Sequence, residues 1–204
     1  MTHRIAGRMT PPPTLVLATR SPSRAAQLTA AGFAFEQVDP PFEDPDQPGQ
    51  SSPPELEARA LAGQKALSVY ELTATGAVIL SADTIVITSD NLHVGKPVDA
   101  EDARSMLVAL IVKPHRILTG VAILLADRML FAHEEAVIDM APPSREALDA
   151  YVASGRWRGA AGGYRLDDLK ELGWSTTTSL DPVGGLPITR VTSMLADLGV
   201  YPNG

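Results

Sequence analysis

Runs of apolar residues alternate along the chain with segments of helical periodicity. The apolar run at residues 15–18 is followed by a polar stretch at 19–24 and then by apolar residues spaced as in a helix, up to Gly32. This order predicts a buried strand, a turn and a helix. The same analysis predicts further strands at 33–39, 77–87, 93–94, 116–125 and 129–140, and helices at 55–72, 99–110, 144–153 and 188–198.

The turn after the first strand is small, hydroxylated and basic. It runs Thr19-Arg20-Ser21-Pro22-Ser23-Arg24. The N–H groups of a helix N-terminus, the helix dipole and the two arginines all favour an anion here, so the turn is a candidate phosphate cradle. The alternative is a capped strand-to-helix turn without a ligand, with Pro22 at the first helical position.

A single acid interrupts the apolar run AVILSADTIVI at residues 77–87. Burying a carboxylate without a partner is costly, so Asp83 either lies at a strand end or has a function. The alternative is a strand–turn–strand in which Asp83 and Thr84 are exposed turn residues.

The helix expected at residues 55–72 contains one lysine of interest. Its predicted apolar face consists of Leu56, Ala60, Leu61, Ala66, Leu67 and Tyr70. Lys65 lies within this pattern, and the common case is a surface lysine whose stem lies on the core. Before this helix, the proline-rich residues 40–54 predict a long surface loop, in which Glu43 and Asp44 are typical solvated charges.

Two further candidate binding residues lie in or after a turn. Lys96 comes directly after a glycine and would either bind a phosphate or cap the turn. His115 stands after Lys113-Pro114. It would either contact a phosphate or a base, or be a turn histidine bonded to the backbone.

Composition narrows the classes of function. The chain has 204 residues and a formal net charge of −7, which argues against a general nucleic-acid binder. It has no cysteine, so disulfides and thiolate chemistry are excluded, which is compatible with the cytoplasm. No apolar run reaches the length of a membrane span. Residues 1–13 lack the apolar core of a signal peptide and are expected to be a mobile extension, with Met9 as an alternative start.

Six motifs in order resemble the Maf family of nucleoside triphosphate pyrophosphatases, once described as septum formation inhibitors. They are LVLATRSPSR at 15–24, SADT at 81–84, VGKPVDAEDARSML at 94–107, HRILTGVAI at 115–123, AAGGYRL at 160–166 and VGGLPI at 183–188. The resemblance extends from about Thr14 to Val200, and it lies in the order and spacing of the motifs.

The resemblance implies a fold and an activity. The expected fold is mixed α/β: a central sheet flanked by helices, with two lobes and a cleft between them, as in inosine triphosphate pyrophosphatases. Residues 14–204 would form this one domain. Maf proteins cleave standard or modified nucleoside triphosphates between the α and β phosphates. They use a divalent cation, Mg²⁺ or Mn²⁺, and they are often dimers.

The resemblance also implies roles for individual residues. Asp83 would be the catalytic base or organise the metal, with Glu43 and Asp44 as further metal ligands. The triphosphate would be surrounded by Ser21, Ser23, Arg24, Lys65, Lys96 and Lys113. Thr84 falls where the family reads the nucleobase, and His115 would support the wall of that nucleobase site. Asp167 stands at the position of the glutamine that recognises the base.

Several positions depart from the family pattern. Ser23 replaces an arginine, Ala26 a glutamate, Ala160 a lysine, Asp167 a glutamine and Pro182 an asparagine. Each lost charged contact is worth roughly 1.5–3 kcal/mol. The leading hypothesis is an active pyrophosphatase with altered nucleotide preference. The alternatives are a weakened homologue that binds a nucleotide, and a regulatory protein linked to cell division.

Overall fold

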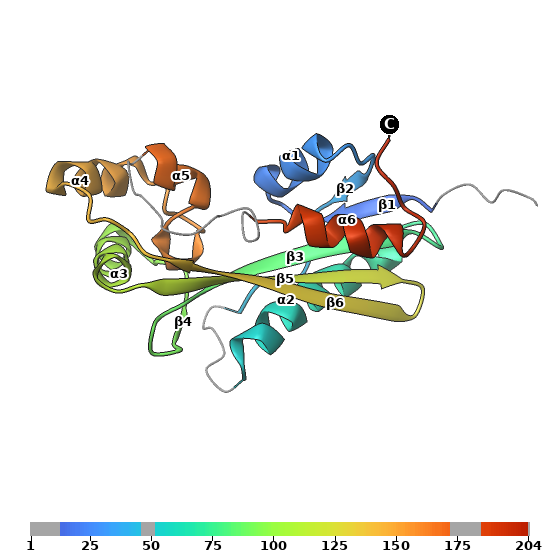
Figure 1. The fold of residues 1–204 in the computed structure, drawn as a ribbon, viewed down its shortest axis with the longest axis horizontal. Helices are drawn as coiled ribbons and strands as arrows, with labels where there is room; N and C mark the ends of the chain where they lie inside the picture. The colour runs from blue at the N-terminus through green and yellow to red at the C-terminus, as the bar shows by residue number, and fades with distance from the viewer. Residues whose placement is uncertain (1–12, 46–51, 172–184, 204) are drawn as a thin grey trace, which may run out of the picture.

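The computed structural model describes residues 13–45, 52–171 and 185–203, and Figure 1 shows their arrangement. The side chains of residues 167, 170 and 171 are outside this description. The predicted N-terminal extension therefore lies almost wholly outside the described residues. Pro182 and the beginning of the VGGLPI motif also lie outside them.

The strands form one mixed sheet. They are β1 (Leu15–Ala18), β2 (Glu36–Val38), β3 (Val78–Ile87), β4 (His93–Val94), β5 (His115–Leu125) and β6 (Arg128–Ile138). Their order is β2-β1-β3-β5-β6, and the short β4 pairs with β3. β1 runs parallel to β2 and β3, whereas β4, β5 and β6 pair with their neighbours in antiparallel fashion.

Most of the helices begin and end close to the predicted positions, whereas the helix at residues 166–171 lies in a segment for which no helix was predicted. They are α1 (Pro22–Ala30), α2 (Pro54–Ser68), α3 (Ala100–Val112), α4 (Arg145–Ser154), α5 (Leu166–Glu171) and α6 (Ile188–Ala196), with 3₁₀ turns η1 (Tyr70–Leu72) and η2 (Ala161–Gly163). Side chains cap several N-termini, because Ser21, Asp99 and Ser144 each accept a hydrogen bond from a backbone N–H three residues later. Gly155, at φ 70°, ends α4 as a C-terminal glycine does.

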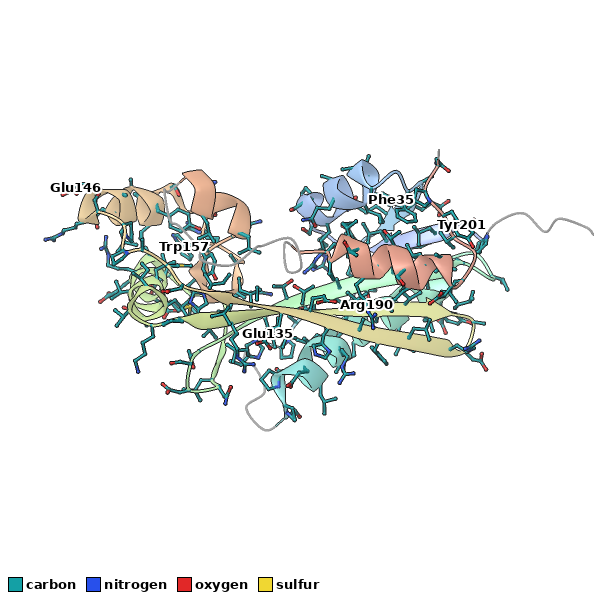
Figure 2. The ribbon with its side chains drawn as sticks, in the orientation of Figure 1. Phe35, Glu135, Glu146, Trp157, Arg190 and Tyr201 are labelled. Atoms are coloured by element: carbon teal, nitrogen blue, oxygen red, sulfur yellow. The ribbon has the colours of Figure 1, made fainter. Side chains whose placement is uncertain are left out.

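Two groups of helices stand on the sheet (Figure 1). α1 and α6 share a core with β1 and the first half of β3. α3, α4 and α5 share a second core with the far ends of β3, β5 and β6. Trp157 is 2% exposed in this second core, and Figure 2 shows it among these helices. The predicted fold class, a mixed sheet flanked by helices in two lobes, is confirmed.

α2 covers the other face of the sheet (Figure 1), and the side that contacts the sheet was predicted only in part, through Leu61 and Ala66. Leu56, Leu67 and Tyr70 are 51%, 55% and 46% exposed, so much of the predicted apolar face points to solvent. The buried side consists of Ala58, Leu61, Ala62, Gly63, Lys65 and Ala66. Small residues face the sheet because the helix lies very close to it. A Cβ added at Gly120 of β5 would be 2.3 Å from the backbone of Ala58.

Across the part of the chain that the structure describes, no helix combines the length and apolar character needed to cross a membrane.

Candidate active site

A cleft opens where β3 extends beyond β1. β1 pairs with residues 78–81 of β3, and β4 pairs with residues 86–87. Between these pairings, residues 82–85 have no strand partner on this side among the described residues. Asp83 therefore lies within a continuous strand and still reaches a cleft of about 1130 Å³. This excludes the strand–turn–strand alternative.

Two carboxylates and two lysines form an ion-pair chain in the cleft. Lys65 of α2 donates to Asp83, and its Nζ also lies 2.7 Å from Oδ1 of Asp44. The other oxygen of Asp44 accepts from Lys96 at 2.7 Å. Asp83 is 7% exposed and Lys65 9%, so this lysine does not lie on the surface as its sequence pattern suggested. Each of these two buried groups therefore has a partner of opposite charge, as buried ionisable groups in proteins generally do.

The pKa of Asp44 reflects two opposing effects. Burial by itself raises the pKa of this carboxyl group. The hydrogen bonds and charges of Lys65 and Lys96 outweigh burial, so the pKa lies below its usual value. Asp44 is therefore an anion at neutral pH, with one oxygen toward each lysine.

The N-terminus of α1 forms the neighbouring wall. Ser21 caps the helix, Pro22 occupies the first turn, and Ser23 lines the cleft beside them. The predicted capped turn is confirmed, whereas the phosphate cradle at the same turn stays a prediction. Arg24 donates from Nε to the carbonyl of Gly185 at 2.8 Å and from its terminal nitrogen to Thr84 Oγ1 at 3.1 Å.

The side chain of Arg24 is thereby fixed between Gly185, which precedes α6, and Thr84 of β3. Burial lowers the pKa of its guanidinium, but an arginine stays charged in a protein. The hydroxyl of Thr84 is also shared with Thr119 Oγ1 at 3.0 Å. The structure thus brings a fixed cation next to residues 82–85 of β3, whose cleft-facing edge has no strand partner among the described residues, within the same cleft as Asp83.

The opposite wall belongs to the second lobe and is mostly apolar. Its lining residues are Val86, Pro97, Ala160, Ala161, Tyr164 and Leu166, with Arg165 among them. The hydroxyl of Tyr164 lies 2.6 Å from Nε2 of His115, whose Nδ1 lies 3.2 Å from the carbonyl of Leu110. Burial raises the pKa of Tyr164 and lowers that of His115, so this contact joins two neutral groups.

Not all residues singled out from the sequence meet in the cleft. Ser21, Ser23, Arg24, Glu43, Asp44, Lys65, Asp83, Thr84 and Lys96 line it together. His115 is 1% exposed and lies behind Tyr164, with both ring nitrogens in contact with protein groups. Lys113 is exposed at the end of α3, outside the lining. Asp167 lies in the first turn of α5, and its side chain is outside the described residues.

The structure also adds residues that the sequence analysis did not single out. Glu57 and His93 line the cleft, with Oε1 and Nδ1 3.0 Å apart. No local pattern pairs them, because they come from α2 and β4. Arg165 could have been singled out from the sequence, because it is a charged residue that follows the Gly162-Gly163 pair by two positions. The described residues contain no group of three or more His, Cys, Asp or Glu side chains arranged to hold a metal.

Comparisons with known proteins show the family of the chain. The family model for Maf-like proteins matches residues 14–198. A dTTP/UTP pyrophosphatase of Symbiobacterium thermophilum is 40% identical over 190 residues, which cover 92% of this chain and 95% of that relative. A dTTP/UTP pyrophosphatase of Cereibacter sphaeroides is 35% identical over 191 residues, covering 92% of this chain and 96% of that relative.

The fold has a counterpart among solved structures. The structure of a HAM1 protein from Coxiella burnetii superimposes with a TM-score of 0.54 at 15% identity, covering 91% of this chain and 99% of that one. At this identity the likeness concerns the fold alone. The family model, by contrast, spans nearly every described element, from β1 to α6. The chain belongs to the Maf family.

Proposed function

We propose that this protein is a nucleoside triphosphate pyrophosphatase that acts on uracil and thymine nucleotides, with Asp83 as its base. The observation that carries the proposal is the position of Asp83. It is a nearly buried carboxylate in a cleft whose other charged groups are mainly cations. The relatives named dTTP/UTP pyrophosphatase give the substrate class.

In the proposed reaction, water attacks the α-phosphorus. The carboxylate of Asp83 orients the water and accepts its proton as the new P–O bond forms. Lys65 holds this carboxylate in place through its ammonium group. The bond between the α-phosphorus and the bridging oxygen breaks, and the electron pair leaves with pyrophosphate.

The charge that develops on pyrophosphate needs compensation. Lys96 and Arg24 supply full positive charges in the cleft, and the first turn of α1 supplies backbone N–H groups. Asp44 separates Lys96 from Lys65 in the structure, so a phosphate oxygen would compete with Asp44 for Lys96. Ser23 adds a neutral hydroxyl where the family has a cation, which leaves Arg20 and Arg24 as the cations at this turn.

A divalent cation fits this site as a companion of the substrate. Magnesium is typically held by one or two carboxylates together with substrate phosphates, and a cage made of protein alone is not needed. Asp83 and Asp44 already converge on one positive group, Lys65, and Oδ1 of Asp44 is buried without a well-directed hydrogen bond. These two carboxylates would hold Mg²⁺ or Mn²⁺, with Glu43 exposed beside them. The cation would neutralise charge on the phosphates.

The test is a pyrophosphate-release assay with Mg²⁺ or Mn²⁺ over UTP, dTTP, CTP, GTP and modified triphosphates. Asp83→Asn keeps the shape of the side chain and removes its basicity, so release falls by at least about 100-fold. Asp90→Asn is the matched control, because Asp90 is an exposed aspartate outside the cleft lining.

Two outcomes would contradict the proposal. Wild type that releases no pyrophosphate from any triphosphate would refute the activity and favour a binding role, which calorimetry with non-hydrolysable analogues would then measure. Full activity of Asp83→Asn would leave the activity and remove Asp83 as its base.

A further inference from the structure

The segment that carries Lys96 has little backbone support of its own. It follows β4, a strand of two residues that pairs with β3 at two positions. A two-stranded hairpin is marginally stable by itself, so β4 needs further contacts to hold its place. Lys96 follows the end of β4 by two residues and donates to the carboxylate of Asp44 at 2.7 Å. The place of its ammonium group in the cleft therefore depends on what holds β4.

Two contacts from outside the sheet hold β4 and the turn after it. The first comes from α2, where Oε1 of Glu57 lies 3.0 Å from Nδ1 of His93, and the two side chains are 12% and 9% exposed. The second comes from η2, where the N–H of Gly162 donates to the carbonyl of Gly95 at 2.9 Å. Lys96 directly follows this carbonyl, so its segment is held by α2 and by the second lobe.

The contact between Glu57 and His93 also relates Lys96 to the rest of the ion-pair chain. Glu57 stands eight residues before Lys65 on α2, which is slightly more than two helical turns, and both side chains line the cleft. α2 therefore positions Lys65 directly, and it positions Lys96 through Glu57 and His93. Because both groups of the contact are nearly buried, each needs the other as a polar partner, and an apolar replacement of either loosens β4.

We infer that Glu57 and His93 are positioning residues, whose contact holds β4 against α2 so that the ammonium group of Lys96 meets the phosphates of the substrate. This inference rests on the proposed function, in which Lys96 binds a phosphate. Neither Glu57 nor His93 touches the substrate in this role. Loss of their contact therefore weakens phosphate binding, and it leaves the proton transfer at Asp83 nearly unchanged.

The experiment measures kcat and KM for UTP in Glu57→Ala, in Lys96→Ala and in the double variant. Glu57→Ala raises KM severalfold with little change in kcat, and His93→Ala does the same, since either change breaks the one contact. The double variant has the KM of Lys96→Ala alone, because a contact that acts through Lys96 then has nothing left to position. Glu57→Gln keeps a side-chain oxygen that accepts a hydrogen bond, so it restores most of the wild-type KM.

Two further measurements separate positioning from other effects. Calorimetric titration with inorganic tripolyphosphate ranks the variants in the same order without turnover, and circular dichroism shows that each variant is folded. Glu101→Ala is the matched control, because Glu101 is also a glutamate in the first turn of a helix but is exposed and outside the cleft lining. It leaves KM unchanged.

Each contrary result has a distinct meaning. A wild-type KM in Glu57→Ala overturns the inference and leaves the proposed function standing. A further rise in KM when Glu57→Ala is added to Lys96→Ala also overturns it, because Glu57 then acts on the substrate without Lys96. Lower stability of Glu57→Ala with unchanged affinity for tripolyphosphate assigns the contact to the fold alone. Wild type that hydrolyses no triphosphate refutes the proposed function, and the tripolyphosphate titrations then decide the inference by themselves.

Discussion

The close contact between β5 and α2 makes Gly120→Ala a sharp test of the fold. A Cβ at this position would lie 2.3 Å from both the carbonyl carbon and oxygen of Ala58, whereas ordinary contact begins at 3.4 Å. The neighbour is helix backbone, so α2 must move by about 1 Å. Such overpacking costs about 1–3 kcal/mol or more. For a chain of this size, in which 1 kcal/mol shifts Tm by about 2–4 °C, we expect Tm to fall by roughly 2–12 °C.

The same displacement reaches the active site. Lys65 stands seven residues after Ala58 on α2, about two turns along the helix, and holds Asp83. Gly120→Ala therefore lowers pyrophosphate release at temperatures where the variant is still folded. Urea unfolding followed by circular dichroism gives the stability, and the release assay gives the activity of the same sample.

Gly63→Ala is the matched control within the same interface. Its added Cβ would meet the ring of Phe131 at 3.0 Å, and this ring is 44% exposed and can turn away. Alanine also favours a helix over glycine by roughly 0.5–1 kcal/mol. The control should therefore match wild type or exceed it in stability. Equal stability of Gly120→Ala and wild type would refute the close packing of α2 on β5.

Three further changes test single interactions. Lys96→Ala removes a partly exposed pair with Asp44, so stability changes by less than about 1 kcal/mol while KM for the triphosphate rises severalfold. Burial lowers the pKa of His115, so wild type loses stability as the pH falls below 6.5, the usual pKa of histidine. Urea titrations from pH 8 to 5 should show a smaller loss of stability for His115→Leu. Arg156→Ala leaves the buried carboxylate of Asp168 short of a partner and lowers unfolding free energy by about 1–3 kcal/mol, which Asp168→Asn in the same chain partly restores.

The elements that sequence analysis located well are those governed by local chemistry. Asp99 and Ser144 cap the helices that they were expected to open, and Gly155 ends α4 in a left-handed conformation. β5 and β6 form the predicted hairpin around Asp127. A cap or a tight turn depends on a few consecutive residues, so a single sequence contains the necessary information.

The features that the sequence did not predict depend on contacts between residues that are far apart along the chain. The buried side of α2 was predicted only in part, because periodicity favours leucines, whereas next to Gly120 the sheet leaves room only for a small residue, Ala58. His115 was a candidate for ligand contact, yet its ring lies against Tyr164, which follows it by 49 residues. The anchoring of Asp168 by Tyr151 likewise needs α4 and α5 to be packed together.

The location of the candidate active site follows from a difference in strand length. β1 has four residues and β3 has ten, and the two start in parallel register at Leu15 and Val78. β3 therefore continues past the end of β1, and Asp83 comes to lie beside the turn that leads into α1. Ligands of parallel sheets bind at the carboxyl ends of strands, where helix N-termini also point. The lengths of both strands are visible in the sequence, but their register is a tertiary property. It is this register that brings the acid in the middle of β3 beside the proposed phosphate cradle at the end of β1.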